Sequence, residues 1–150
     1  MAKITAQLTA GTIVHLSNGS HEWTGDEPLA VGGTDSGPTP YELLLGSLAA
    51  CTCITLALYA RHKGIELGSV TASYTYERKH AEDCEKWDDP KAGFFDHIST
   101  EIVIGGHFDD AQRKRLAQVA ERCPVHKTLE HGVVISDNVS FRVSDQLNQE

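Results

Sequence analysis

The chain has 150 residues, of which 40% are hydrophobic and 23% are charged, and its net charge is −8. This length and composition are typical of one globular domain, which we expect to span residues 1–150. The negative charge disfavours nucleic acid and anionic membrane surfaces as partners, because both repel an acidic protein.

The N-terminal residues MAKITAQLTAG lack the apolar segment of a signal peptide. Four cysteines without an export signal indicate a reducing compartment, where thiols stay free unless they are catalytic or bind metal. We therefore expect a cytoplasmic protein.

Residues 4–16, ITAQLTAGTIVHL, alternate apolar and polar side chains around Ala10-Gly11, which predicts a hairpin of two strands. Asn18-Gly19 predicts a second turn, followed by a short strand near residues 21–24. Glycine and proline are frequent in residues 25–40, which indicates a long loop.

The longest apolar run, PTPYELLLGSLAACTCITLALYARHKG (38–64), predicts a long helix. Thr39, Pro40 and Glu42 form the pattern of a capping box with proline at the first helical position. Positive charges fill the last turn and Gly64 follows them, which marks the C-terminal end.

Residues 43–60 of this run carry no charge over 18 positions, a length that could span a membrane. Small and hydroxylated residues dilute its hydrophobicity, and no second apolar segment accompanies it. We therefore predict a central helix that is covered on every side, with no membrane partner.

The second half of the chain alternates strands and helices. Strands are predicted over residues 69–79 and 98–104 as antiparallel neighbours, joined by an acidic polar connection. Helices are predicted over residues 107–123, with Asp109 as the cap, and over residues 123–132. An apolar stripe on the first of these helices comprises Leu116, Val119, Ala120 and Cys123.

Residues 133–143 are predicted to form a closing strand or a hairpin that turns at Asp137-Asn138. The last seven residues are expected to fray. The order of strands, helix, strands, helices and strand is typical of an α+β fold with antiparallel sheets.

The cysteines differ in their surroundings. Cys51 and Cys53 are two residues apart in one helix, so their side chains point about 200° apart and cannot bridge each other. Either can be a small buried hydrophobe, and for Cys53 this is the expected role. Cys123 precedes a helix whose N-terminus favours a thiolate, whereas the carboxylates beside Cys84 disfavour one.

Other chemistries have weaker support. Cys123 and His126 could share a metal with Cys51 or a loop histidine, but no CxxC or HxxxH spacing is present, and we expect no metal. No GxSxG motif suggests serine hydrolysis. The residues alone permit two-cysteine redox chemistry without requiring it.

The blocks GPTPYELLLGSLAACTCITL and RCPVHKTL together resemble the OsmC/Ohr family of thiol-dependent hydroperoxide reductases, over about residues 20–143. The form GPTPYELLL is similar to a less characterised OsmC-like branch. The resemblance implies an α+β fold in an intertwined homodimer, with sheets of both subunits wrapped around two central helices. It also implies active sites at the dimer interface.

By the same resemblance, Cys51 matches the peroxidatic cysteine and Cys123 the resolving one. The implied activity is reduction of organic hydroperoxides, and of hydrogen peroxide to a lesser degree, with an external dithiol as reductant. No metal or flavin cofactor is implied.

Two features depart from the characterised hydroperoxidases. Their glutamate ten residues before the peroxidatic cysteine is Tyr41 here, and Glu42 follows it; their thiolate-stabilising arginine has no counterpart before Arg61. The basic residues that remain available are Lys3, His15 and His21. Without a cation, the pKa of Cys51 should stay at or above the usual value of about 8.5.

These departures keep two other functions open. One is a non-enzymatic dimer that binds a small apolar ligand at the cysteine pocket. The other is a redox-sensing or metal-linked thiol protein.

Overall fold

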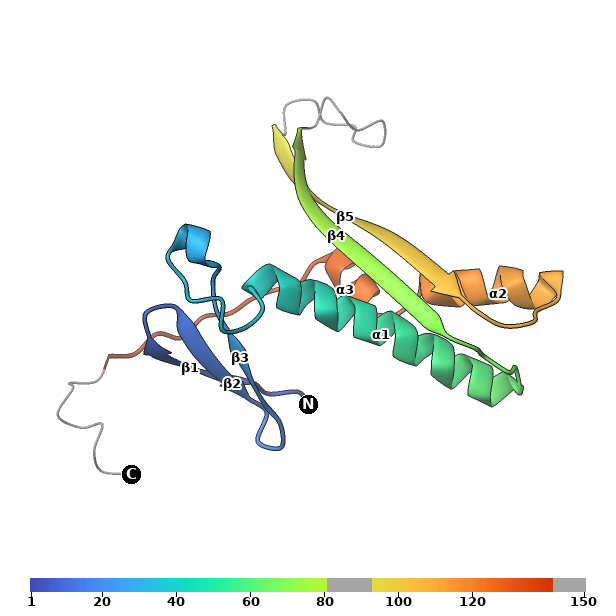
Figure 1. The fold of residues 1–150 in the computed structure, drawn as a ribbon, viewed down its shortest axis with the longest axis horizontal. Helices are drawn as coiled ribbons and strands as arrows, with labels where there is room; N and C mark the ends of the chain where they lie inside the picture. The colour runs from blue at the N-terminus through green and yellow to red at the C-terminus, as the bar shows by residue number, and fades with distance from the viewer. Residues whose placement is uncertain (81–92, 142–150) are drawn as a thin grey trace.

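The computed structural model describes residues 1–80 and 93–141 (Figure 1). It is an α+β fold with antiparallel sheets, as predicted. The elements are β1 (Thr5–Ala10), β2 (Ile13–Ser17), β3 (Glu22–Gly25), a 3-10 turn (Leu29–Val31), α1 (Pro40–Lys63), β4 (Val70–His80), β5 (Phe94–Ile104), α2 (Asp110–Ala120) and α3 (Pro124–His131).

The N-terminal strands form an antiparallel sheet in the order β1-β2-β3, which confirms the predicted hairpin and short third strand. Gly11 and Gly19 occupy the turns with φ of 55° and 91°, a conformation that costs glycine little. All six residues of β1 are exposed, so neither face of this strand is covered within the protomer.

A buried carboxylate fixes the loop after β3. Asp26 is 2% exposed and accepts hydrogen bonds from the hydroxyls of Thr12 and Thr34, each at 2.6 Å. The backbone N–H groups of Thr34 and Ser36 also donate to it, at 3.0 and 3.1 Å. The bond from Thr12, followed by that from Thr34, holds the pKa of this carboxyl far below its usual range.

Helix α1 begins and ends as predicted. Thr39 and Glu42 form the capping box: the Thr39 N–H donates to Glu42 Oε2 at 2.7 Å and the Glu42 N–H donates to Thr39 Oγ1 at 3.3 Å. Gly64 ends the helix with φ of 65°, in the left-handed region.

One face of α1 carries the core. It packs against β4, α2 and α3, and its buried residues are Leu48, Thr52, Leu56 and Ala60. In Figure 1, α1 crosses the centre of the molecule beneath the β4–β5 hairpin. Leu56 contacts the buried side of α2, which comprises Leu116, Val119 and Ala120.

The opposite face of α1 is open. Ile54 and Leu58 are 58% and 50% exposed, so the prediction of a helix covered on every side is wrong for the isolated protomer. By length and composition alone α1 could cross a membrane. Its packing against three other elements instead identifies it as a core helix of this fold.

Strands β4 and β5 form a long antiparallel hairpin, with Val70 paired to Ile104 at one end and His80 paired to Phe94 at the other. The predicted pairing is confirmed, and β5 begins at Phe94 rather than near Ile98. The register continues without a shift to the end of the described strand residues, which is why β5 is longer than expected, while β4 has the predicted length.

Helix α2 is shorter than the predicted range 107–123. Asp109 caps it as expected, but the helix ends at Ala120, and Cys123 lies beyond it as the N-cap of α3. Two non-helical residues thus separate the end of α2 from Cys123, and the chain changes direction there.

The predicted closing strand is wrong for residues 133–141, which adopt no regular structure. All nine residues are exposed, and Val134 and Phe141 reach 96% and 94%. In Figure 1 this segment leaves α3 and runs toward the end of the molecule that holds β1–β3. Its alternation is that of a strand, but none of the strands in residues 1–80 and 93–141 pairs with it.

Candidate active site

Two thiols meet where α1 packs against α3. Cys51 lies near the middle of α1 and is half-buried, while Cys123 is fully buried at the start of α3. The Cys123 side chain is among the groups that raise the pKa of Cys51, so the two thiols are neighbours. The packing of α1 against α3 thus brings together two cysteines that are far apart in the sequence.

The position of Cys123 follows from the local sequence. Cys123 has extended backbone angles, with φ of −64° and ψ of 145°, and Pro124 occupies the first helical position. The Cys123 Sγ accepts a hydrogen bond from the His126 N–H at 3.3 Å, as an N-cap side chain does. The predicted N-cap role is confirmed.

Cys51 receives hydrogen bonds from two other groups, the backbone N–H of Val125 and the hydroxyl of Thr55. Val125 and His126 are consecutive, so the unpaired N–H groups of the first turn of α3 serve both sulfur atoms. Thr55 lies four residues after Cys51, on the same face of α1.

The pKa of Cys51 is raised above that of an ordinary thiol, chiefly because burial disfavours the thiolate. The Val125 N–H acts against this, the contact with Cys123 adds to it, and Thr55 acts against it. The predicted direction is confirmed. Within residues 1–80 and 93–141, no cationic side chain is among the groups that shift this pKa, and Lys3, His15 and His21 play no part.

The other cysteines stand apart from the pair. Cys53 is half-buried and free. It lies two residues after Cys51 in α1, so its side chain points to a different side of the helix. Cys84 lies outside the described residues, so its predicted character is untested.

Tyr41, in place of the glutamate of the characterised enzymes, belongs to an aromatic cluster. Its ring stacks on that of Tyr76, with centroids 4.2 Å apart. The Tyr76 hydroxyl donates to Asp96 Oδ1 at 2.7 Å. The hydrogen bond with Tyr41, followed by that with Asp96, raises the pKa of Tyr76. Glu42 remains in the capping box.

A cavity of about 380 Å³ lies between α1, β5 and the first turns of α3. Its apolar wall comprises Leu48, Ile98 and Leu129. Its polar lining includes Asp96 and His126, whose Nε2 lies 3.2 Å from Glu130. His126 connects this cavity to the thiols, because its N–H bonds Cys123. Cys51 itself is not part of the lining.

No group of three histidine, cysteine or acidic side chains converges in the described part of the chain. Cys123 and His126 are indeed close, but their contact runs through the His126 backbone rather than its ring.

Sequence reasoning missed three contributors to the site: the Val125 N–H, Thr55 and Asp96. Two of them had a local signal. A residue four positions from a helical cysteine shares its face, and the residue after a helix-opening proline has an unpaired N–H. Asp96 reaches the cluster only through the β4–β5 register, and no local pattern indicates that.

Comparison with known proteins identifies the fold. The family model described as OsmC-like protein matches residues 33–136. The OsmC-like protein of Mycoplasma pneumoniae is 26% identical, with a TM-score of 0.62 over 87% of this chain and 87% of that one. No curated protein sequence matches the chain.

Two further solved structures share the fold. The organic hydroperoxide resistance protein OsmC of Legionella pneumophila is 19% identical, with a TM-score of 0.60 over 86% of this chain and 88% of that chain. The organic hydroperoxide resistance protein OhrB of Bacillus subtilis is 22% identical, with a TM-score of 0.56 over 85% and 89%. Because the family match covers well over half of its residues, this chain belongs to the OsmC-like protein family.

Proposed function

We propose that this protein is a thiol-dependent peroxidase that reduces organic hydroperoxides, with Cys51 as the peroxidatic and Cys123 as the resolving cysteine. The contact between the two thiols carries the proposal. A peroxidatic sulfur needs a second thiol within bonding reach, and Cys123 is the neighbouring thiol.

The proposed reaction begins at the Cys51 thiolate. Its sulfur attacks the terminal peroxide oxygen, the O–O bond breaks, and the alkoxide takes a proton and leaves as an alcohol. Cys51 is then a sulfenic acid. The Cys123 sulfur attacks the Cys51 sulfur, water leaves, and a disulfide forms. An external dithiol reduces that disulfide by exchange and becomes oxidised itself.

The first turn of α3 supplies the electrostatic support for this step. The Val125 N–H donates to Cys51 and lies at the positive end of the helix dipole, which favours developing negative charge on sulfur. Thr55 donates a second hydrogen bond. In this proposal, neutral donors do part of the work of the missing arginine.

Two observations support an organic substrate. The cavity beside α3 has an apolar wall of Leu48, Ile98 and Leu129, against which an alkyl group can pack. The Legionella pneumophila and Bacillus subtilis proteins of the same fold are named for organic hydroperoxide resistance.

We further propose that the working form is a homodimer in a reducing cytoplasm. Three surfaces lie uncovered among the described residues: the apolar Ile54–Leu58 face of α1, strand β1 and residues 133–141. A second copy of the chain would cover the first, and its β1–β3 sheet could pair with the last.

The test is steady-state reduction of cumene hydroperoxide with a dithiol donor, comparing wild type with Cys51→Ser, Cys123→Ser and the matched control Cys53→Ser. Cys51→Ser should abolish turnover, and Cys123→Ser should abolish it while still allowing one peroxide to be consumed per site. Cys53→Ser should retain activity. Activity that survives Cys51→Ser would refute the proposal.

A second function is favoured by the raised pKa of Cys51, which limits the thiolate at neutral pH. In that case the dimer binds a small apolar molecule at the thiol pair without turning it over. Binding of cumyl alcohol in the absence of any peroxide reduction would support this alternative.

A further inference from the structure

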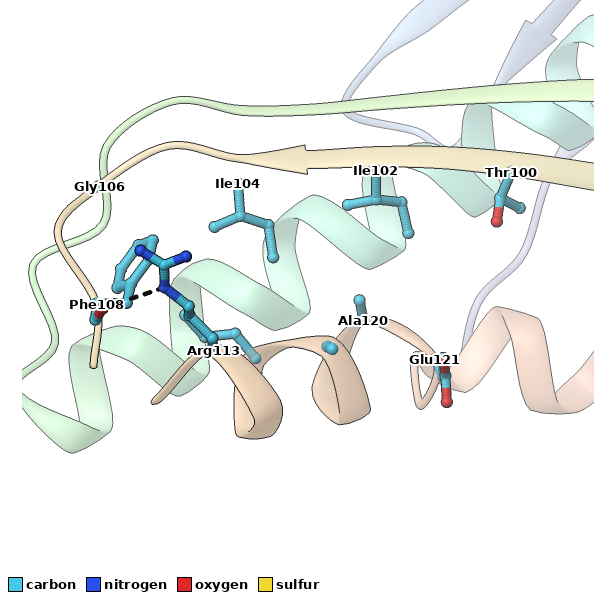
Figure 2. Close-up of a pocket in the computed structure, with 10 residues that line it drawn as sticks. Thr100, Ile102, Ile104, Gly106, Phe108, Arg113, Ala120 and Glu121 are labelled. Atoms are coloured by element: carbon cyan, nitrogen blue, oxygen red, sulfur yellow. Dashed lines mark hydrogen bonds between the residues drawn. The ribbon is translucent and has the colours of Figure 1, made fainter. Parts of the chain in front are cut away.

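A cavity of about 500 Å³ lies away from the thiols, between β5 and α2. Figure 2 shows its two walls: Ile102 and Ile104 point from β5 toward α2, and Ala120 faces them from the helix. Leu116 and Ala117 complete an apolar floor. This volume falls in the range of pockets that hold small molecules, roughly 300–1,000 Å³.

One end of this groove carries a single cation. The Arg113 Nε donates to the Phe108 carbonyl at 3.2 Å, and in Figure 2 its guanidinium extends beside the Phe108 ring toward β5. No acidic side chain pairs with Arg113 among residues 1–80 and 93–141. Its two terminal amino groups therefore keep their donors for a ligand.

The Phe108 ring lies beside the cation at this end of the groove. The Phe108 ring lies so close to Gly106 that a Cβ there would come within 2.4 Å of the ring. Gly106, with φ of 145°, therefore allows the ring to close the end of the groove. The exposed Arg113 side chain reaches this end of the groove through its hydrogen bond to the Phe108 carbonyl.

The other end of the groove carries a negative charge instead of a positive one. Glu121 and Thr100 line it, so a carboxylate there would meet a negative charge. Arg113 and Glu121 are eight residues apart on the α2 side, roughly 12 Å at 1.5 Å per residue. The groove thus offers a cation, an apolar stretch of about this length, and an anion, in that order.

We propose that this groove is a binding site for a small, elongated monocarboxylate with an apolar chain. The carboxylate would bind the terminal amino groups of Arg113, and the chain would lie on Ile102, Ile104 and Ala117. Glu121 would exclude a second carboxylate at the far end. The site is independent of the proposed thiol chemistry, since its lining includes no cysteine and no group that bonds one.

The test is an NMR titration of the full-length protein with octanoate and with its neutral analogue octanamide. Octanoate should cause saturable shifts at Gly106 and Ala117, with an affinity about tenfold above that of octanamide. Arg113→Gln should weaken octanoate binding about tenfold and leave octanamide unchanged. The matched control is Arg115→Gln, because Arg115 lies 5.8 Å from the Tyr59 ring and does not line the groove.

A second variant fills the groove and does not depend on charge. Ala117→Phe should abolish binding of both probes. Equal affinity for octanoate and octanamide, absence of saturable binding, or equal losses in the two arginine variants would overturn the proposal. So would dissociation of a dimer by Ala117→Phe, because the groove would then be a subunit contact.

Discussion

The backbone N–H of His126 donates a 3.3 Å hydrogen bond to the Sγ of Cys123, and the preceding N–H, that of Val125, donates to Cys51. Two adjacent amides of one helical turn thus serve the two neighbouring thiols. This arrangement sets the relative position of the thiols independently of any side-chain cation.

The first prediction concerns the disulfide. One equivalent of cumene hydroperoxide should link Cys51 to Cys123, because the two thiols are neighbours. Peptide mapping by mass spectrometry under non-reducing conditions would identify the bond. A bond from Cys51 to Cys53 or Cys84 would contradict the assignment.

The second prediction is a pH dependence. Burial raises the pKa of Cys51, so the thiolate, which is the reactive form, should become populated only as the pH rises past the ordinary thiol value of about 8.5. Alkylation of Cys51, measured with Cys53 and Cys84 replaced by serine, should therefore accelerate from pH 7 to beyond pH 9.

Substitutions of Thr55 also test how the pKa of Cys51 controls its reactivity. Thr55→Val removes a hydrogen bond that lowers the pKa of Cys51, so alkylation at pH 7 should slow by about threefold. Thr55→Ser keeps the hydroxyl and should react like wild type. A rate that is equal in the valine and serine variants would show that this hydrogen bond does not act on the thiolate.

The third prediction concerns assembly. The wild-type chain should sediment as a dimer at micromolar concentration, and Ile54→Arg should shift it to monomer or unfold it, because Ile54 lies on the open apolar face of α1. Leu29→Arg is the control, since Leu29 is exposed on the 3-10 turn, away from that face. A stable wild-type monomer would exclude the homodimer.

The fourth prediction concerns the loss of stability in acid when Asp26, which anchors the loop after β3, is protonated. The pKa of Asp26 is depressed in the folded state, so its stabilising effect is complete above the unfolded value of about 3.9 and is lost as the pH falls below it. The thermal midpoint of wild type should therefore drop steeply below pH 4. Asp26→Asn should have a lower midpoint at pH 7 and a flatter acid limb.

Asp35→Asn is the matched control for this experiment. Asp35 lies in the same loop, is exposed, and has φ of 57°, which asparagine tolerates. Its acid limb should follow that of wild type. Identical acid limbs in wild type and Asp26→Asn would show that Asp26 does not carry the effect.

Structural features that depend on a few neighbouring residues were predictable from the sequence. The Thr39–Glu42 capping box and Gly64 delimit α1, and both act within one turn of the residues that reveal them. The N-cap role of Cys123 was predictable for the same reason, because Pro124 directly follows it.

Features that depend on distant partners were not. The carboxylate of Asp26 looks like an ordinary loop acid until Thr12 and Thr34 are brought to it by the sheet and the loop. The contact of Cys51 with the Val125 N–H depends on how α1 packs against α3, and only the family resemblance paired the two cysteines beforehand.

The prediction of a strand in residues 133–141 failed for a different reason. Their pattern is that of a strand, but a strand also needs a neighbour with free N–H and C=O groups. No strand in the described part of the chain pairs with this segment, so the alternation of apolar side chains indicated a strand propensity that is not realised there.

The exposure of this segment has a consequence for biogenesis under the homodimer proposal. A newly synthesised chain would display Val134, Phe141 and the open face of α1 until it meets a second copy. The rate of dimer formation then depends on the square of the chain concentration, and aggregation through the same exposed apolar surfaces competes with it. Slow expression, or chaperones that hold the emerging chain, should raise the soluble yield more than any change to the core.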